Sequence, residues 1–208
     1  MTTSATHAPA PDKGPARIGP NAIIRVAEAL RTQHGEAVTA ELFRRAGLEK
    51  YLPAMPGQMV DEGEVITLHQ LLRPALGAES ARAVAREAGL RTGDYLLANR
   101  IPRPAQFILR LLPPALASRV LLRAIGGHAW TFAGSGRFSA ESAGKARLSI
   151  AGCPLCRGTT AEHPVCDYYA ATFERLYRTL VSRRATVVET ECQAVGAPAC
   201  VFDITWKR

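Results

Sequence analysis

Five cysteines are the side chains of this 208-residue chain most able to bind a metal ion, and all of them lie between Cys153 and Cys200. The N-terminal sequence has no apolar stretch typical of a secretory signal, so we expect a reducing compartment. Clustered cysteines in such a compartment indicate metal or redox chemistry rather than disulfides. We therefore predict a metal site in the C-terminal quarter of the chain.

Two sets of four residues suit the tetrahedral coordination that zinc prefers. One set is Cys153, Cys156, Cys192 and Cys200, and the other is Cys166, Glu189, Cys192 and Cys200. Glu189 and Cys192 would lie on opposite faces of a regular strand, so both reach one ion only if the strand bulges between them. A third interpretation is that the cysteines are buried free thiols. The spacing alone does not choose among these interpretations.

Arginines alternate with long apolar side chains between residues 82 and 125. The segment contains eight arginines and only two acidic residues, Glu87 and Asp94. A flat apolar ligand with carboxylates at its edge needs an apolar slot and guanidinium groups that bind carboxylates through paired hydrogen bonds. The same pattern is typical of an amphipathic helical hairpin with leucines in the core and arginines in water. The candidate ligand-binding residues here are Tyr95, Arg100, Arg103, Phe107 and Arg110.

The hydrophobic periodicity predicts helices first and strands later. Helices are expected at 18–33, 36–46, 64–76 and 80–99, the last with a break near Gly89 and Gly93. Prolines divide residues 95–132 into short helices. Strands are expected at 130–138, 146–151, 186–193 and 200–206, with a helix at 165–183.

The predicted fold class is α+β: an N-terminal helical layer, then a small antiparallel sheet with a packed helix and a C-terminal β-hairpin at the metal site. Residues 1–16 are expected to form a disordered tail. Residues 17–208 are expected to form a single ligand-binding domain, mainly helical over 17–128 and with the sheet over 129–208.

The composition is that of a soluble protein, with 47% apolar and 21% charged residues. No apolar stretch is long enough to span a membrane, so we expect a cytoplasmic location. The net charge of +8 suits nucleic acid, an anionic membrane surface or an acidic ligand. No helix-turn-helix or zinc-finger spacing favours nucleic acid. The arginines from Arg103 to Arg123 could contact a membrane surface peripherally.

The last 45 residues contain Pro164-Val-Cys166, then Glu189-Thr-Glu-Cys192 and Gly196-Ala-Pro-Ala-Cys200. These motifs resemble the 4-vinyl reductase domain family, which includes the effector-sensing domains of some transcription activators. Three cysteines and a glutamate bind structural zinc in those sensing domains. The resemblance therefore implies that the zinc ligands are Cys166, Glu189, Cys192 and Cys200.

Further motifs extend the resemblance over most of the chain. They are Asp94-Tyr-Leu-Leu-Ala-Asn-Arg-Ile-Pro102, Leu112-Pro-Pro-Ala-Leu-Ala117 and His128-Ala-Trp-Thr-Phe-Ala-Gly-Ser-Gly136. They resemble members of the family from bacteriochlorophyll biosynthesis in purple photosynthetic bacteria. The resemblance implies a magnesium tetrapyrrole as ligand, enzymes of that pathway as partners, and a homodimer.

His128, Trp130 and Phe132 are the candidate residues for holding the tetrapyrrole ring. A neutral imidazole can bind the magnesium ion axially, and aromatic rings can stack on the macrocycle. The alternative is an ordinary histidine that is hydrogen-bonded to the backbone.

The family label implies reduction of a vinyl group, which needs a hydride source. The sequence has no G-x-G-x-x-G motif after a predicted strand and no ferredoxin-type cysteine run. We therefore expect a carrier that binds a magnesium tetrapyrrole and delivers it to pathway enzymes. An 8-vinyl reductase is the alternative, and a ligand-sensing regulatory module is a second alternative.

Overall fold

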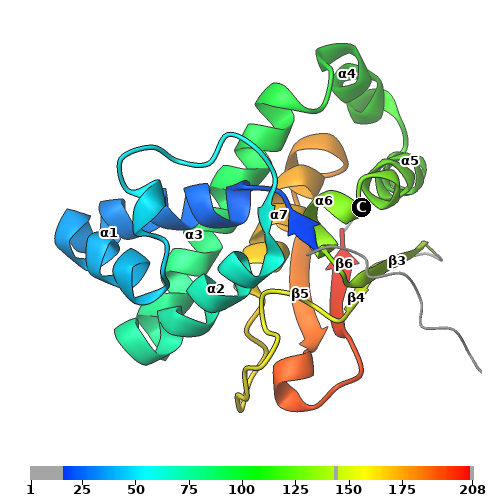
Figure 1. The fold of residues 1–208 in the computed structure, drawn as a ribbon. Helices are drawn as coiled ribbons and strands as arrows, with labels where there is room; N and C mark the ends of the chain where they lie inside the picture. Colours follow the sequence, from blue (N-terminus) through cyan, green and yellow to red (C-terminus); the bar gives the residue numbers. More distant parts are fainter. Residues whose placement is uncertain (1–15, 143–144, 207–208) are drawn as a thin grey trace, which may run out of the picture.

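In a computed structural model that describes residues 16–142 and 145–206, a helical layer and a small antiparallel sheet pack on opposite sides of helix α7 (Asp167–Leu180) (Figure 1). This arrangement confirms the predicted mixture of helices and a small antiparallel sheet. The expected tail at 1–16 lies outside the described residues, except for Ala16. Among the described residues, no helix is both long and apolar enough to cross a bilayer.

Three helices and a 3-10 turn form the N-terminal layer: α1 (Asn21–Arg45), η1 (Glu49–Tyr51), α2 (Glu62–Leu76) and α3 (Ala78–Asn99). Gly35, with a φ of 82°, interrupts α1 where the sequence predicts the end of a first helix. The Asp61 side chain caps α2 by accepting a hydrogen bond from the Gly63 amide at 2.7 Å. Strands β1 (Arg17–Ile18) and β2 (Val60–Asp61), which the sequence did not predict, pair with each other.

Helix α3 is continuous, so the predicted break near Gly89 and Gly93 is wrong. Both glycines face α7 where the two helices pack together. A Cβ atom at Gly93 would lie 2.6 Å from the Cβ of Arg175, and one at Gly89 would collide with the Tyr168 carbonyl. The glycines therefore allow close approach of two helices, which local sequence cannot distinguish from a helix break.

Three shorter helices connect the layer to the sheet: α4 (Arg103–Leu111), α5 (Pro114–Gly127) and α6 (Trp130–Ala133). The prolines divide α4 from α5 as predicted. The predicted strand at 130–138 is wrong in its first half, because α6 forms a helical turn with the Ala133 amide bonded to the Ala129 carbonyl at 2.8 Å. Gly134, with a φ of 57°, then reverses the chain. This turn places the Phe132 ring against Phe138 and other aromatic rings of the core.

The sheet is antiparallel, in the spatial order β3-β4-β6-β5. Its strands are β3 (Arg137–Ser142), β4 (Ala146–Ala151), β5 (Thr186–Glu191) and β6 (Cys200–Thr205), and the 3-10 turn η2 (Gln193–Val195) lies between the last two. Leu148, Ile150, Phe202 and Ile204 are fully buried on the face that packs against α7. The ring of Phe202 lies 5.5 Å from that of Phe173 on α7. The sheet therefore rests on one aromatic helix face, and the helix on α3.

Candidate metal centre and ligand groove

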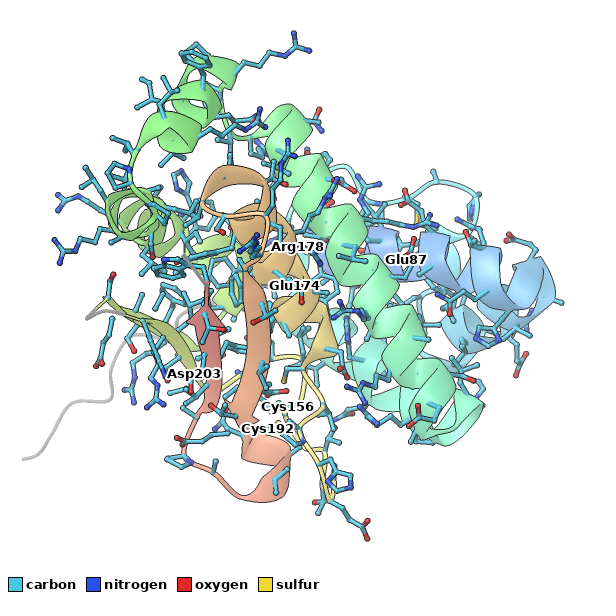
Figure 2. All side chains as sticks on the ribbon, turned by 180° about the vertical axis from the view of Figure 1, so that it is seen from behind. Glu87, Cys156, Glu174, Arg178, Cys192 and Asp203 are labelled. Atoms are coloured by element: carbon cyan, nitrogen blue, oxygen red, sulfur yellow. The ribbon has the colours of Figure 1, made fainter. Side chains whose placement is uncertain are left out.

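All five cysteines are buried, and their sulfur atoms gather where α7 and β6 begin. The sulfur–sulfur distances are 3.6 Å for Cys153–Cys166, 3.4 Å for Cys156–Cys200, 3.6 Å for Cys166–Cys200 and 3.8 Å for Cys192–Cys200. Figure 2 shows Cys156 and Cys192 close together near the end of β5. Separate segments therefore supply donors to one small volume.

Local structure explains how these segments meet. Cys166 precedes the first residue of α7, and Cys200 is the first residue of β6. Gly196, with a φ of 95°, permits the tight connection between β5 and β6. The Cys153 amide donates a hydrogen bond to Gln193 Oε1 at 2.7 Å, which ties the loop after β4 to that connection.

Two sets of four donors lie within 4.8 Å of one another: Cys153, Cys156, Cys166 and Cys200, and Cys166, Glu189, Cys192 and Cys200. The second set matches the one that the family resemblance implies. The first set corrects the CxxC alternative, because Cys166 takes the place expected for Cys192. The CxxC thiols are part of the cluster rather than unpaired residues outside it.

Glu189 reaches the cluster through the strand irregularity that its spacing from Cys192 requires. The pairing of β5 with β6 shifts register between Glu189 and Glu191. Glu189 Oε2 accepts a hydrogen bond from the Cys166 amide at 2.7 Å, whereas Oε1 is buried without a hydrogen-bond partner among the described residues. Burial, reinforced by the neighbouring Cys192, raises the pKa of Glu189 to about 8. A cation beside Oε1 would satisfy this oxygen and favour the ionised carboxylate.

The thiols are in a similar position. Hydrogen bonds from Cys153 and from the other cysteines, together with burial, raise the pKa of Cys166 well above its ordinary value. Several buried thiolates this close together need a positive charge to offset their repulsion. A divalent ion supplies that charge and deprotonates coordinating thiols. The donor set, its burial and the orphaned Glu189 oxygen fit a closed zinc site, which would be structural because four protein ligands leave no position for substrate.

A groove of about 350 Å³ lies between α5 and β3. Its lining residues are Arg119, Leu122, Arg123, Gly126, Phe138, Ser139, Ala140 and Ser142. The four residues from α5 have the i, i+3, i+4, i+7 spacing of one helix face. Leu122 and Phe138 are apolar, and two guanidinium groups stand beside them, which suits an apolar ligand with anionic substituents.

This groove was missed by the sequence analysis. The helical spacing of Arg119, Leu122, Arg123 and Gly126 was visible in the sequence, but it is also typical of an ordinary amphipathic helix. No sequence signal showed that β3 would lie opposite this face.

The predicted ligand-binding residues are distributed over three places and do not line the groove. Tyr95 lies at the end of α3, with the guanidinium groups of Arg25 and Arg100 at 5.0 and 5.9 Å from its ring centre. Arg103 and Phe107 are exposed on α4. Arg110, on the same helix, donates a hydrogen bond to the Thr179 carbonyl at 3.2 Å.

The other three predicted residues follow the groove along the chain. Trp130 is 62% exposed on α6. Phe132 packs edge-on against Phe138, with ring centres 5.3 Å apart, and so supports the groove from behind. His128 ends α5 two residues after Gly126 and is exposed. Its Nδ1 lies 3.0 Å from the Ala124 carbonyl oxygen.

Comparison with known proteins identifies similar chains. Residues 146–206 match the model of the 4-vinyl reductase domain family. The "Bacteriochlorophyll synthase 23 kDa chain" of Cereibacter sphaeroides is 44% identical over 194 residues, covering 92% of this chain and 93% of the relative. The protein of the same name from Rhodobacter capsulatus is 44% identical over 195 residues, covering 94% and 90%.

Solved structures show the same fold at low sequence identity. An H-NOX protein from K. algicida superposes with a TM-score of 0.59 at 10% identity, covering 92% of this chain and 97% of that one. An H-NOX protein from S. oneidensis gives a TM-score of 0.53 at 11% identity, covering 92% and 100%. The relatives confirm the resemblance seen in the sequence, and this chain belongs to the family of 4-vinyl reductase domain proteins that includes the bacteriochlorophyll synthase 23 kDa chains.

Proposed function

We propose that this protein is a carrier that binds a magnesium tetrapyrrole intermediate of bacteriochlorophyll biosynthesis and delivers it to enzymes of that pathway. The names of its relatives connect those proteins with bacteriochlorophyll synthesis. The titles of similarly folded H-NOX structures name heme and porphyrin distortion. A tetrapyrrole is therefore the ligand class that both comparisons suggest.

The groove between α5 and β3 is the observation on which this proposal rests. Its volume of about 350 Å³ falls within the range of small-molecule sites. Arg119 and Arg123 form no ion pair within 4.0 Å among the described residues, so their guanidinium groups are available to ligand carboxylates. Leu122 and Phe138 would contact the apolar ring.

His128 is the candidate axial ligand for the magnesium ion. The Ala124 carbonyl can only accept a hydrogen bond, so the Nδ1 contact at 3.0 Å requires a proton on Nδ1. In the neutral imidazole the lone pair then belongs to Nε2. Because the side chain is exposed at the end of α5, Nε2 can approach a ring held beside that helix.

The metal cluster has a supporting role in this proposal. Zinc bound by Cys166, Glu189, Cys192 and Cys200 would join the start of α7 to the strands β5 and β6. Phe138 of the groove pairs with Ile150, which in turn pairs with Cys200. The cluster and the groove are thus connected through paired strands.

Titration of the purified protein with magnesium protoporphyrin tests the carrier function. We expect a shift of the Soret band and micromolar or tighter binding. The Arg119→Gln/Arg123→Gln variant should bind at least about tenfold more weakly, because two charge-assisted hydrogen bonds are lost. The matched control is Arg103→Gln/Arg110→Gln, which removes the same charge from α4.

The outcomes separate the alternatives. If the α4 variant binds more weakly and the groove variant does not, the ligand lies against α4 and the residues predicted from the sequence hold it. A protein that shows no Soret shift and no fluorescence quenching is not a tetrapyrrole carrier. Loss of the 8-vinyl absorption signature with NADPH and this protein alone would identify a reductase instead.

A further inference from the structure

Helix α4 exposes the apolar face that an amphipathic helix normally buries. Phe107, Ile108 and Leu111 are 64%, 56% and 70% exposed. The inward side instead uses Gln106, whose Nε2 donates hydrogen bonds to the Leu97 and Ile101 carbonyls at 2.6 and 2.8 Å. A soluble domain gains nothing from this orientation, since apolar side chains are stabilised by leaving water. The exposed face therefore indicates a binding surface.

The next helix extends this surface. Leu116 and Val120 on α5 are 45% and 46% exposed and lie one turn apart. They occupy a different face of α5 from the groove residues Leu122 and Gly126. Figure 1 shows α4 and α5 together at one end of the molecule, away from α1 and α2. We call the five exposed residues of α4 and α5 the apolar surface.

The charge around the apolar surface has one sign. Between Asp94 and Glu141 the sequence contains no acidic residue. The same stretch contains six arginines: Arg100, Arg103, Arg110, Arg119, Arg123 and Arg137. In the part of the chain that the structure describes, none of the six forms an ion pair within 4.0 Å. The surface thus combines exposed aromatic and aliphatic side chains with uncompensated positive charge.

We propose that α4 and α5 bind the surface of an anionic lipid bilayer. Phe107, Ile108 and Leu111 would enter the boundary between head groups and acyl chains, and Arg103 and Arg110 would contact lipid phosphates. Two short amphipathic helices with apolar faces and flanking arginines have the chemistry of interfacial binding rather than membrane spanning. This inference does not depend on the proposed carrier function, although a carrier of an apolar pigment would benefit from it.

A second copy of the chain is a poorer occupant of the same surface. In a two-fold symmetric dimer the same patch contacts itself, so Arg103, Arg110 and their neighbours would face identical arginines. Like charges brought together in an interface are repulsive. An anionic bilayer instead offers opposite charge and an apolar layer at once.

Co-sedimentation of the full-length protein with lipid vesicles tests the proposal without any pigment. We expect binding to vesicles that contain phosphatidylglycerol, weak binding to pure phosphatidylcholine, and a marked decrease with added salt. The Phe107→Ser/Leu111→Ser variant should lose about 100-fold in partitioning, because two apolar insertions are removed. The Arg103→Gln/Arg110→Gln variant should lose about 25-fold.

Matched controls make the result specific to this surface. Val188→Ser removes a 58% exposed apolar side chain from β5, and Arg45→Gln removes an exposed arginine from α1. Both should retain vesicle binding. Circular dichroism should show folded protein for every variant, since all of the changed side chains except Arg110 project from the surface without a hydrogen bond.

The proposal is overturned if the protein does not sediment with anionic vesicles, or if the α4 variants bind as well as the wild type. It is also overturned if the protein forms dimers that Phe107→Ser/Leu111→Ser converts to monomers, because the apolar surface would then be an interface between copies.

Discussion

Cys166 and Cys200 belong to both possible sets of metal ligands, so these two thiolates are required whichever set binds the ion. The other four donors compete for two positions, since zinc takes four ligands. Glu189 has the stronger claim, because its Oε1 is buried without another partner and a hydrogen bond to the Cys166 amide already orients its carboxylate. Cys153 and Cys156 would then remain thiols beside the metal.

This ranking predicts the metal content of two matched variants. Purified wild-type protein should contain about one zinc ion per chain. Cys192→Ser should lose most of it, whereas Cys153→Ser should retain it, although both residues are equally buried cysteines of the cluster. Plasma mass spectrometry of the purified proteins measures both. Zinc loss in Cys153→Ser with full zinc in Cys192→Ser would assign the site to the four cysteines instead.

At the scale of elements, the contact between α3 and α7 depends on Gly89. Alanine normally stabilises a helix by about 1 kcal/mol relative to glycine. Here the added methyl group would meet the Tyr168 carbonyl, so Gly89→Ala should destabilise the protein by about 1–3 kcal/mol through overpacking. Urea denaturation measures the difference. Gly57→Ala, where no atom lies within 4 Å of the new Cβ, is the control and should change stability little.

The elements also show what the sequence could predict. Periodicity located the interruption at Gly35 and the strands β4, β5 and β6, because each depends on local pattern. The need for a bulge after Glu189 followed from strand geometry alone. The errors arose where distant contacts decide: Gly89 allows helix packing rather than a break, and Phe132 turns into an aromatic core instead of continuing a strand.

The candidate site divides in the same way. Cysteine and glutamate ligands were identifiable from residue type and motif, because few other side chains bind zinc. The groove could not be identified, since it exists only where α5 lies across β3. The arginines and aromatics chosen for the ligand were recognised by type, but type does not show which side of a helix faces a partner. Phe107 is the clearest example, because it is exposed on α4 rather than enclosed in a slot.

For the molecule as a whole, the strand pairing joins two sites that the chain separates. Phe138 in the groove pairs with Ile150, and Ile150 pairs with Cys200 in the cluster. Cys166 in the same cluster precedes α7, and the aromatic face of that helix supports the Phe132 ring behind the groove. A metal ion would therefore hold both the strand floor and the helix behind the groove in place.

Removal of the metal should accordingly weaken ligand binding as well as stability. We expect a chelator-treated protein to have a lower Tm and a reduced affinity for magnesium protoporphyrin, because structural zinc contributes directly to folding free energy. Addition of zinc should restore both properties, and Cys192→Ser should resemble the chelated wild type. Differential scanning calorimetry and Soret titration at matched protein concentration measure the two effects. If the metal-free protein melts at a lower temperature but binds the porphyrin with unchanged affinity, the cluster stabilises the fold without organising the groove, and the coupling through Phe138, Ile150 and Cys200 is wrong.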